Sequence, residues 1–490
     1  MSILRRIAKN ATVTFIGNNL LKILSTILVI LIARYLGDVE YGKFTFALSF
    51  TGLFLVLMDL GTRILIVREI SQNKKQAPKI VANVLMLKFI SSLLVYALIL
   101  AISFALGYNK ETLAAIAIAA FGLIFDSLST TVGSIFQAFE KMEVPAFTKL
   151  IRIIVRFAFT IPLLIEGSSF LLILAVYALV HFLDFLISMI ICYKKFVKLS
   201  FDFDKKLIFY LVKKSFPFLL SGIFVTVYFR IDITLMSKLA PESLSWIYSN
   251  VSRDAIIGWY SAAYNLLDAA TSLAGAVSAA ILPVAVFYFK ESKEKLIRLY
   301  VTSVRFLIYL SIPIAVGTTL LADKIILILY GQEYAHAVLA LQILIWTIVP
   351  LCINYMMGAM MIAIHKEKKG IIVLFLNVVV NVVLNLILIP RYSLYGAALA
   401  TILTELFYFG GYYYIMSKNF YRINLIKVLA KPIIASAFMG FVISIFRNWN
   451  VLLLVFIGIV TYFLTMLLIK SFNEDDKIMI KKLISKESLS

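Results

Sequence analysis

The chain has 490 residues, of which 62% are hydrophobic and only 15% are charged, and its formal net charge is +21. A soluble protein of this length needs far more polar surface, so the composition excludes a soluble globular protein and is typical of a polytopic membrane protein. The two cysteines lie in apolar stretches and the three histidines are far apart in the sequence. We therefore expect neither a disulfide framework nor a metal site.

Apolar stretches long enough to cross a bilayer recur along nearly the whole chain. Helices are the expected structure, because each backbone polar group in lipid needs a partner within its own segment. The first stretch lacks a small-residue cleavage pattern and is read as a retained span. We predict an all-α membrane protein with about fourteen spans, at 11–36, 42–68, 80–106, 113–139, 145–165, 169–193, 209–240, 255–289, 297–321, 336–364, 370–389, 393–416, 428–446 and 451–470.

Lysine and arginine are concentrated in alternate connections between these spans. The basic segments include "REISQNKK" (68–75), "KESKEKLIR" (290–298) and "HKEKK" (365–369), and the other connections hold few basic residues. The positive-inside rule then predicts a multi-pass protein of the cell membrane with both termini in the cytoplasm. Orientation accounts for the net charge, so a nucleic-acid partner is not expected.

The basic connection 194–214 separates six predicted spans from eight. We predict an N-terminal lobe at 1–197, a cytoplasmic linker at 198–208, a C-terminal lobe at 209–417, and two additional helices with a tail at 418–490. A weak internal echo supports the division, since "YGKFTFALSF" (41–50) and "IGWYSAAYNL" (257–266) both place a glycine and aromatic residues near the start of a long helix. Repeated halves are common in transporters.

The apolar stretch "VTVYFRIDITLM" (225–236) contains two charged residues, Arg230 and Asp232. Positions i and i+2 lie on different faces of a helix, so these side chains do not simply neutralise each other. A charge within a span usually faces the bundle interior or water. Each of the two therefore needs its own partner or a hydrated space.

Other spans carry polar residues at helical spacing. Asn18 and Lys22 share one face of the first span, and Asp59 and Arg63 form an i,i+4 pair in the second. Further polar positions within spans are Asp126, Gln137, Asn265 and Asp268. We predict that these stripes line a water-filled cavity between two helix bundles.

Two simpler interpretations apply to part of this set. Asparagines one turn apart, at Asn377, Asn381 and Asn385, are typical of helix–helix hydrogen bonding within a bundle. Charges at span borders, such as Lys43 and Lys238, are typical of snorkelling side chains.

Enzyme chemistry is poorly supported by the sequence, and no catalytic residue is predicted. Three scattered histidines offer no Ser/His/Asp or Cys/His arrangement, and no phosphate-binding P-loop is present. The triplet "DFD" (202–204) imitates a glycosyltransferase motif, but it lies in a short charged linker and is attributed to chance.

Several segments together resemble a known transporter family. They are "ARYLGDVEYGKFTFALSF" (33–50), "DLGTRILIVREIS" (59–71), "RIDITLM" (230–236), "IGWYSAAYNLLDAATSL" (257–273), "LYGQEYAHAVLALQIL" (329–344) and "NVVLNLILIPRYSLYGAALATILTEL" (381–406). The chain resembles the oligosaccharide (O-antigen type) flippases, also called polysaccharide biosynthesis transport proteins. Their superfamily includes multidrug and toxin extrusion transporters and lipid II flippases. The connector between "LMSKLA" and "IGWYSAAYNL" is longer here than is usual in that family.

The resemblance implies two pseudo-symmetric six-helix lobes followed by two C-terminal helices, with a central cavity that opens alternately to each side. The implied substrate is a polyprenyl-(pyro)phosphate-linked oligosaccharide, moved to the outer leaflet for assembly of surface polysaccharide or glycoprotein glycans. The implied partners are this lipid-linked oligosaccharide, membrane lipids and glycan-assembly enzymes, and the chain is expected to act as a monomer.

Side-chain chemistry assigns roles within such a cavity. Lys22 and Arg230 are the candidates for phosphate contact, and the candidates for contact with sugar hydroxyls are Asn18, Gln137 and Asn265. The remaining charged positions would hold these groups in place or take up a coupling proton, and they are Asp59, Arg63, Asp126, Asp232 and Asp268. No cofactor is expected; the driving force would come from H⁺, Na⁺ or the membrane potential, which favours outward movement of an anion.

Three alternatives remain. A cation-coupled multidrug exporter of the same superfamily would favour acidic residues, whereas the first span contains Lys22 and no acidic residue. A lipid II-type flippase would share the anionic lipid-linked cargo. A non-transporting membrane assembly protein would lack charged stripes within its spans.

Overall fold

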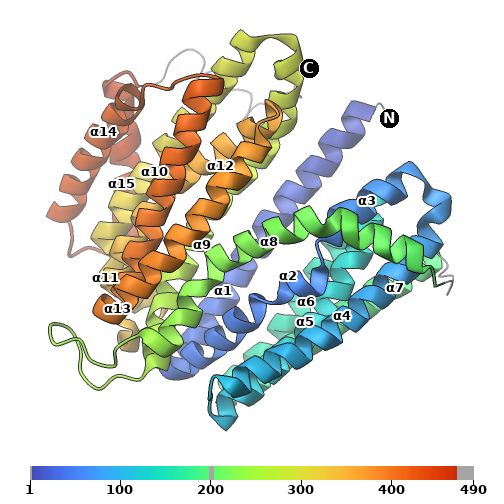
Figure 1. Ribbon diagram of the computed structural model, residues 1–490. Coiled ribbons are helices and arrows are strands. Elements are labelled where there is room, and N and C mark those ends of the chain that lie inside the picture. Colours follow the sequence, from blue (N-terminus) through green and yellow to red (C-terminus); the bar gives the residue numbers. More distant parts are fainter. Residues whose placement is uncertain (1–2, 198–202, 472–490) are drawn as a thin grey trace. The chain divides into compact units, whose positions relative to one another are not determined.

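The computed structural model describes residues 3–197 and 203–471, except for the side chains of residues 3–16, 18, 19 and 273 (Figure 1). Over these ranges the structure consists of helices joined by turns and irregular connections, with one isolated antiparallel bridge between Leu244 and Tyr248. The helices are α1 (Ile3–Gly52), α2 (Leu55–Asp59), α3 (Thr62–Gln72), η1 (Lys74–Gln76), α4 (Ala77–Ala105), α5 (Lys110–Ala138), α6 (Glu143–Ile165), α7 (Phe170–Lys195), α8 (Lys205–Leu239), α9 (Arg253–Glu291), α10 (Lys293–Leu329), η2 (Gln332–Tyr334), α11 (Ala337–Leu344), η3 (Ile345–Thr347), α12 (Ile348–Ala363), α13 (Glu367–Asn419), α14 (Leu425–Ile445) and α15 (Val451–Leu468).

Eleven of the described helical stretches are long and apolar enough to cross a membrane. Two of them have 53 residues each, and both are interrupted by a non-helical residue, Gly37 in α1 and Ser393 in α13. Each of these two stretches counts as two spans when it is divided at its non-helical residue. With the more highly charged α6 added, the total equals the fourteen spans predicted from the sequence. The predicted all-α polytopic membrane fold is confirmed.

The chain divides into two compact units, which are described separately. Unit 1 comprises Met1–Ser261 and Asn385–Leu394, and unit 2 comprises Ala262–Leu384 and Tyr395–Ser490. The lobe boundaries at 197, 209 and 417 stay a prediction.

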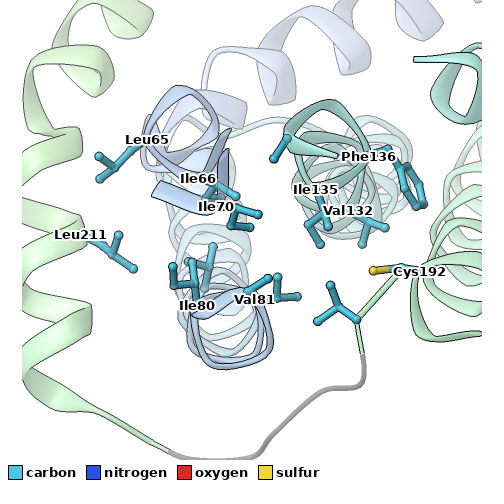
Figure 2. Close-up of a cluster of buried hydrophobic side chains, with 14 residues drawn as sticks. Leu65, Ile66, Ile70, Ile80, Val81, Val132, Ile135, Phe136, Cys192 and Leu211 are labelled. Carbon is cyan, nitrogen blue, oxygen red and sulfur yellow. The ribbon is translucent and has the colours of Figure 1, made fainter. Parts of the chain in front are cut away.

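The core of unit 1 includes a cluster of buried hydrophobic side chains, most of them aliphatic, to which five helices contribute (Figure 2). Leu65, Ile66 and Ile70 of α3 face Ile80 and Val81 of α4 across this cluster. The remaining labelled residues are Val132, Ile135 and Phe136 of α5, Cys192 of α7 and Leu211 of α8. This packing joins the first helix after the linker, α8, to the helices that precede it.

In unit 2 the last two helices pack on α10. Tyr309 and Leu321 of α10 form a buried cluster with Met439 of α14 and Tyr462 of α15. The Tyr462 hydroxyl donates to the Tyr309 carbonyl at 2.8 Å, which satisfies a buried polar group within the apolar cluster.

Two glycines of unit 1 allow α1 and the start of α9 to cross at very short range. A Cβ on Gly42 would lie 1.7 Å from the Asp254 carbonyl oxygen, and one on Gly258 would lie 2.1 Å from the Asp38 carbonyl oxygen. Trp259 Nε1 donates to the Asp38 carboxylate at 2.8 Å beside this crossing. The glycines shared by "YGKF" and "IGWY" are therefore the contact point between the two segments.

The second predicted span is not one continuous helix. After Gly52 the chain forms the short helix α2, and Leu60 and Gly61 then adopt left-handed backbone angles, with φ of 54° and 64°, before α3 begins. A Cβ on Gly61 would lie 2.4 Å from the Leu219 backbone nitrogen, so this break lets α8 approach closely. The expectation of an uninterrupted helix over 42–68 was wrong.

Candidate functional site: a basic pocket in unit 1

A pocket of about 270 Å³ lies between α1 and α6. Its lining residues are Leu21, Lys22, Ser25, Lys149, Arg152, Ile153 and Arg156, and we call it the basic pocket. Every charged side chain among these lining residues is cationic. The arrangement is suited to an anion, because several positive charges converge on one small space.

Helix geometry explains why α6 presents three cations together. Lys149, Arg152 and Arg156 are spaced i, i+3 and i+7, which places them on one face of the helix. Arg156 lies thirteen residues after the first residue of α6, roughly 20 Å along the helix at 1.5 Å per residue. The charged face therefore extends well into the span.

Acidic side chains behind the pocket hold Arg152 in place. Its Nη1 lies 3.2 Å from Asp126 Oδ1 of α5 and 3.5 Å from Asp184 Oδ2 of α7. Asp184 is buried and also accepts a hydrogen bond of 2.6 Å from the Ser129 hydroxyl. Arg152 is thus oriented by two carboxylates while the same side chain lines the pocket.

Arg156 is positioned by α7. The guanidinium carbon of Arg156 lies 3.9 Å from the ring centroid of Tyr177, a cation–π geometry. Its Nη2 lies 3.5 Å from Nε2 of His181, whose other ring nitrogen lies 3.1 Å from the Asp126 carboxylate. Asp126, predicted as a cavity charge, therefore connects α5, α6 and α7 at this point.

Asp59 does not pair with Arg63 as predicted. The break at Leu60 and Gly61 separates them, Arg63 is exposed, and Asp59 Oδ1 instead lies 2.5 Å from the Lys88 ammonium of α4. The i,i+4 expectation failed because it required one continuous helix.

Arg230 and Asp232 have separate partners, as their spacing on the helix requires. Arg230 Nη1 lies 3.4 Å from the Leu48 carbonyl oxygen of α1, and its guanidinium occupies the space beside Gly52. Asp232 is buried and accepts hydrogen bonds from the Tyr260 hydroxyl of α9 and from the Ile233 N–H. Neither residue is among those that line the basic pocket.

The other predicted residues lie elsewhere. Gln137 is half-buried on α5. In unit 2, Asn265 Nδ2 donates to the Tyr330 hydroxyl at 3.2 Å, and Asp268 is exposed on α9. The side chain of Asn18 lies outside the described residues. Asn377, Asn381 and Asn385 are buried, as expected for asparagines within a helix bundle.

Sequence reasoning missed most of the basic pocket. Only Lys22 of its charged lining was singled out, and the missed positioning residues behind it are Asp184 and His181. A usable signal was present in the spacing of Lys149, Arg152 and Arg156, since three cations on one face of a span are as informative as the stripe on the first span.

Comparison with known proteins gives the chain its family. The family model described as "Polysaccharide biosynthesis protein" matches residues 7–289, more than half of the chain. The chain belongs to the polysaccharide biosynthesis protein family. The resemblance drawn from the sequence is thereby confirmed.

Two curated relatives of this family member have known names. The chain is 29% identical over 254 residues to the lipid II flippase MurJ of Bacillus subtilis, covering 49% of this chain and 45% of that protein. It is 26% identical over 149 residues to the probable low-salt glycan biosynthesis flippase Agl15 of Haloferax volcanii, covering 30% of this chain and 32% of that protein. The matches thus span less than half the length of these relatives.

Solved structures establish the fold of the family member more completely. An inward closed structure of the lipid II flippase MurJ matches with a TM-score of 0.77 and 18% identity, covering 93% of this chain and 98% of that chain. An inward-facing multidrug resistance transporter of the MATE family matches with a TM-score of 0.61 and 15% identity, covering 82% of this chain and 94% of that chain. At these identities the likeness concerns the fold alone.

Proposed function

We propose that this protein is a flippase that moves a polyprenyl-(pyro)phosphate-linked oligosaccharide from the cytoplasmic to the outer leaflet by alternating access. The anionic, hydroxyl-rich headgroup would cross through the protein while the polyprenyl tail stays in lipid. The product would serve assembly of surface polysaccharide or glycoprotein glycans. The protein would act as a transporter and not as an enzyme.

The observation that carries this proposal is the charge of the basic pocket. Four cationic side chains converge there from two helices of unit 1, the long apolar α1 and the more highly charged α6, which the sequence predicts as a span. Charges within a span are costly and generally serve a function. A phosphate group repays that cost, since hydrogen bonds between cationic side chains and phosphate oxygens are among the strongest in proteins.

Individual roles follow from position. Lys22 and Lys149 would contact phosphate as mobile point charges, and Arg152 would offer its planar guanidinium. Asp126 and Asp184 would position Arg152. The remaining sequence-based assignments stay proposals, and they concern Asn18, Gln137, Asn265, Arg230, Asp59, Arg63, Asp232 and Asp268.

The names of the relatives support the class of cargo. One is a lipid II flippase and the other a probable glycan biosynthesis flippase. We favour a lipid-linked oligosaccharide and keep lipid II as the second candidate, because both carry an anionic lipid-linked headgroup. A multidrug exporter is disfavoured by the cationic lining, which would repel a cationic drug.

The same proposal includes a membrane arrangement. Both termini would lie in the cytoplasm, with lobes at 1–197 and 209–417 and two further helices within 418–490. The chain would act as a monomer beside glycan-assembly enzymes, and H⁺, Na⁺ or the membrane potential would drive the cycle without a cofactor.

The test is a flipping assay with purified protein in proteoliposomes. Polyprenyl-pyrophosphate-oligosaccharide and lipid II would be supplied in parallel, with a cationic dye as a third cargo. We expect the wild type to move the lipid-linked oligosaccharide fastest. The double variant Lys149→Gln/Arg152→Gln should slow that movement at least about tenfold, since each lost charged hydrogen bond is worth about 1.5–3 kcal/mol.

Lys213→Gln is the matched control, because Lys213 is an exposed lysine of α8 that does not line the basic pocket. Thermal unfolding would verify that each variant is folded. Transport of the dye in place of the glycolipid, or equal flipping by folded Lys149→Gln/Arg152→Gln protein, would refute the proposed function.

A further inference from the structure

Unit 1 contains a second pocket, of about 590 Å³, that the mechanism above does not use. It lies where α4 and α8 end and where α5 and α9 begin. The other ends of α4 and α8 carry the lysine-rich segments, with η1 before α4 and Lys205 and Lys206 at the start of α8. The second pocket is therefore one membrane crossing away from those segments, at the end of unit 1 that the proposed orientation places outside the cell.

One wall is the segment 240–252, which folds back on itself. The Val251 N–H donates to the Glu242 carbonyl at 2.8 Å, and the Asn250 N–H donates to the Ser243 hydroxyl at 3.0 Å. Arg253 Nε donates to the Ala240 carbonyl at 3.0 Å, and this hydrogen bond joins the two ends of the segment. These bonds hold the wall in a defined shape before any ligand arrives.

The facing wall is the turn between α4 and α5, joined to the end of α8. The Tyr108 hydroxyl and the Ser237 hydroxyl lie 2.9 Å apart. Lys238 Nζ donates to the Leu106 carbonyl at 2.8 Å and lies 4.0 Å from the centroid of the Tyr108 ring. Because both walls are tied to helix ends of the same unit, the pocket is a built feature of unit 1.

The lining chemistry differs from that of the basic pocket. Its charged side chains are balanced, with Lys238 and Arg253 offset by Glu242 and Asp254. Most of the other lining side chains are hydroxyls and amides, including Asn109, Thr112, Asn250 and Ser252. Such a surface offers donors and acceptors in similar measure without a net charge, which suits a ligand rich in hydroxyl groups and disfavours an anion.

We propose that this second pocket, which we call the polar pocket, binds the neutral sugar portion of the cargo on the outer side. The inference rests on the proposed function for the identity of the cargo and for the orientation. The volume lies within the range of small-molecule sites and accommodates a short oligosaccharide. The basic pocket would hold the phosphate, and the polar pocket would receive the hydroxyl-rich sugars as the headgroup emerges.

The test measures binding of free sugars to the full-length protein in nanodiscs. The probes are short neutral oligosaccharides, with acidic oligosaccharides and inorganic pyrophosphate for comparison, and the readout is saturation-transfer NMR with titration. The test variant is Glu242→Ala/Asn250→Asp, since both residues are exposed on the pocket wall and aspartate tolerates the positive φ of 54° at position 250. Glu166→Gln is the matched control, because Glu166 is exposed at the same end of unit 1 outside the polar pocket.

We expect neutral oligosaccharides to bind the wild type and Glu166→Gln equally, and to bind Glu242→Ala/Asn250→Asp about tenfold more weakly, the effect of losing one to two hydrogen bonds. Absence of neutral-sugar binding by the wild type, equal binding by the folded double variant, or preference for acidic sugars would overturn the inference. If sugars bind in the polar pocket but flipping is unaffected by Lys149→Gln/Arg152→Gln, the proposed function is refuted and sugar binding by this pocket stands. If flipping depends on the basic pocket but no sugar binds in the polar pocket, this inference is refuted and the proposed function stands.

Discussion

Lys88 is a lysine with a fully buried side chain, and the Asp59 carboxylate in contact with it stabilises its charge. The ammonium lies 2.5 Å from Asp59 Oδ1, and the side chain has no exposed surface. An ammonium buried without a partner is strongly unfavourable, so this ion pair acts as a unit. The sequence placed Lys88 inside an apolar stretch but gave no indication of its partner, because the partner is 29 residues away on another helix.

Removing one partner of this ion pair should destabilise the protein more than replacing both partners. We expect Asp59→Ala to lower the free energy of unfolding by about 3–5 kcal/mol, because Lys88 is left buried and charged, whereas Asp59→Asn/Lys88→Met should recover most of the loss. The measurement is thermal and denaturant unfolding in detergent. Equal stability of Asp59→Ala and the wild type would show that Lys88 does not depend on this carboxylate.

The crossing of α1 and α9 belongs to the scale of whole elements. The sequence contains two similar glycine-containing segments near the starts of helices, 41–50 and 257–266. It does not indicate that these two segments contact each other. Packing supplies the reason, since any Cβ at Gly42 would overlap the Asp254 carbonyl of the other helix. Repetition of a small residue is visible in one sequence, whereas its contact partner is not.

Gly42→Ala should disrupt this crossing. We expect a loss of more than about 3 kcal/mol, beyond ordinary overpacking, because backbone and not a flexible side chain must move. Gly133→Ala on α5 is the control, since its added Cβ would meet no atom within 4 Å apart from its chain neighbours and the backbone of its own helix, and alanine favours a helix interior. Comparison of their unfolding temperatures decides the matter, and a neutral Gly42→Ala would show that the helices are not in close contact.

Asp204 begins α8 outside the membrane-spanning part of that helix. Its carboxylate accepts hydrogen bonds from the Lys206 and Leu207 N–H groups and lies 2.8 Å from the Lys79 ammonium. The bond to Lys79, followed by the backbone bonds, lowers the pKa of Asp204 from its ordinary value of 3.8. This contribution to stability is present above the unfolded pKa and is lost as the pH falls through the lower folded pKa.

We therefore expect Asp204→Asn to weaken the pH dependence of unfolding on the acidic side. The wild type should lose more stability than the variant when the pH is lowered below about 4, since only the wild type has a carboxylate to protonate there. Unfolding temperatures measured across an acidic pH series test this. Parallel curves for the two proteins would mean that the Asp204 cap does not contribute.

At the scale of the whole molecule, hydropathy and charge asymmetry were the strongest signals in the sequence. Hydropathy predicted the helical spans well, because length and apolar content are local properties, and the orientation predicted from charge stays a prediction. Both signals predicted the candidate site poorly, since Arg152 depends on carboxylates of α5 and α7 that are distant in the sequence. The charges of α6 were also easily passed over, because they lie within an otherwise ordinary span.

The proposed orientation can be measured with single introduced cysteines. Ser245→Cys lies in the segment 240–252 and Lys368→Cys in the first turn of α13, within the basic segment 365–369, and both positions are exposed. The native cysteines, Cys192 and Cys352, are buried. A membrane-impermeant maleimide should label only Ser245→Cys in intact cells and both variants after lysis; the reverse pattern would invert the topology.

The central claim is that the phosphate of a lipid-linked oligosaccharide binds in the basic pocket of unit 1. The most direct test is a cryo-electron microscopy structure of the protein in nanodiscs with polyprenyl-pyrophosphate-oligosaccharide. We predict pyrophosphate density within hydrogen-bonding distance of Lys22, Lys149 and Arg152, which disappears in Lys149→Gln/Arg152→Gln protein. Pyrophosphate density located away from these side chains, or unchanged in the double variant, would contradict the account.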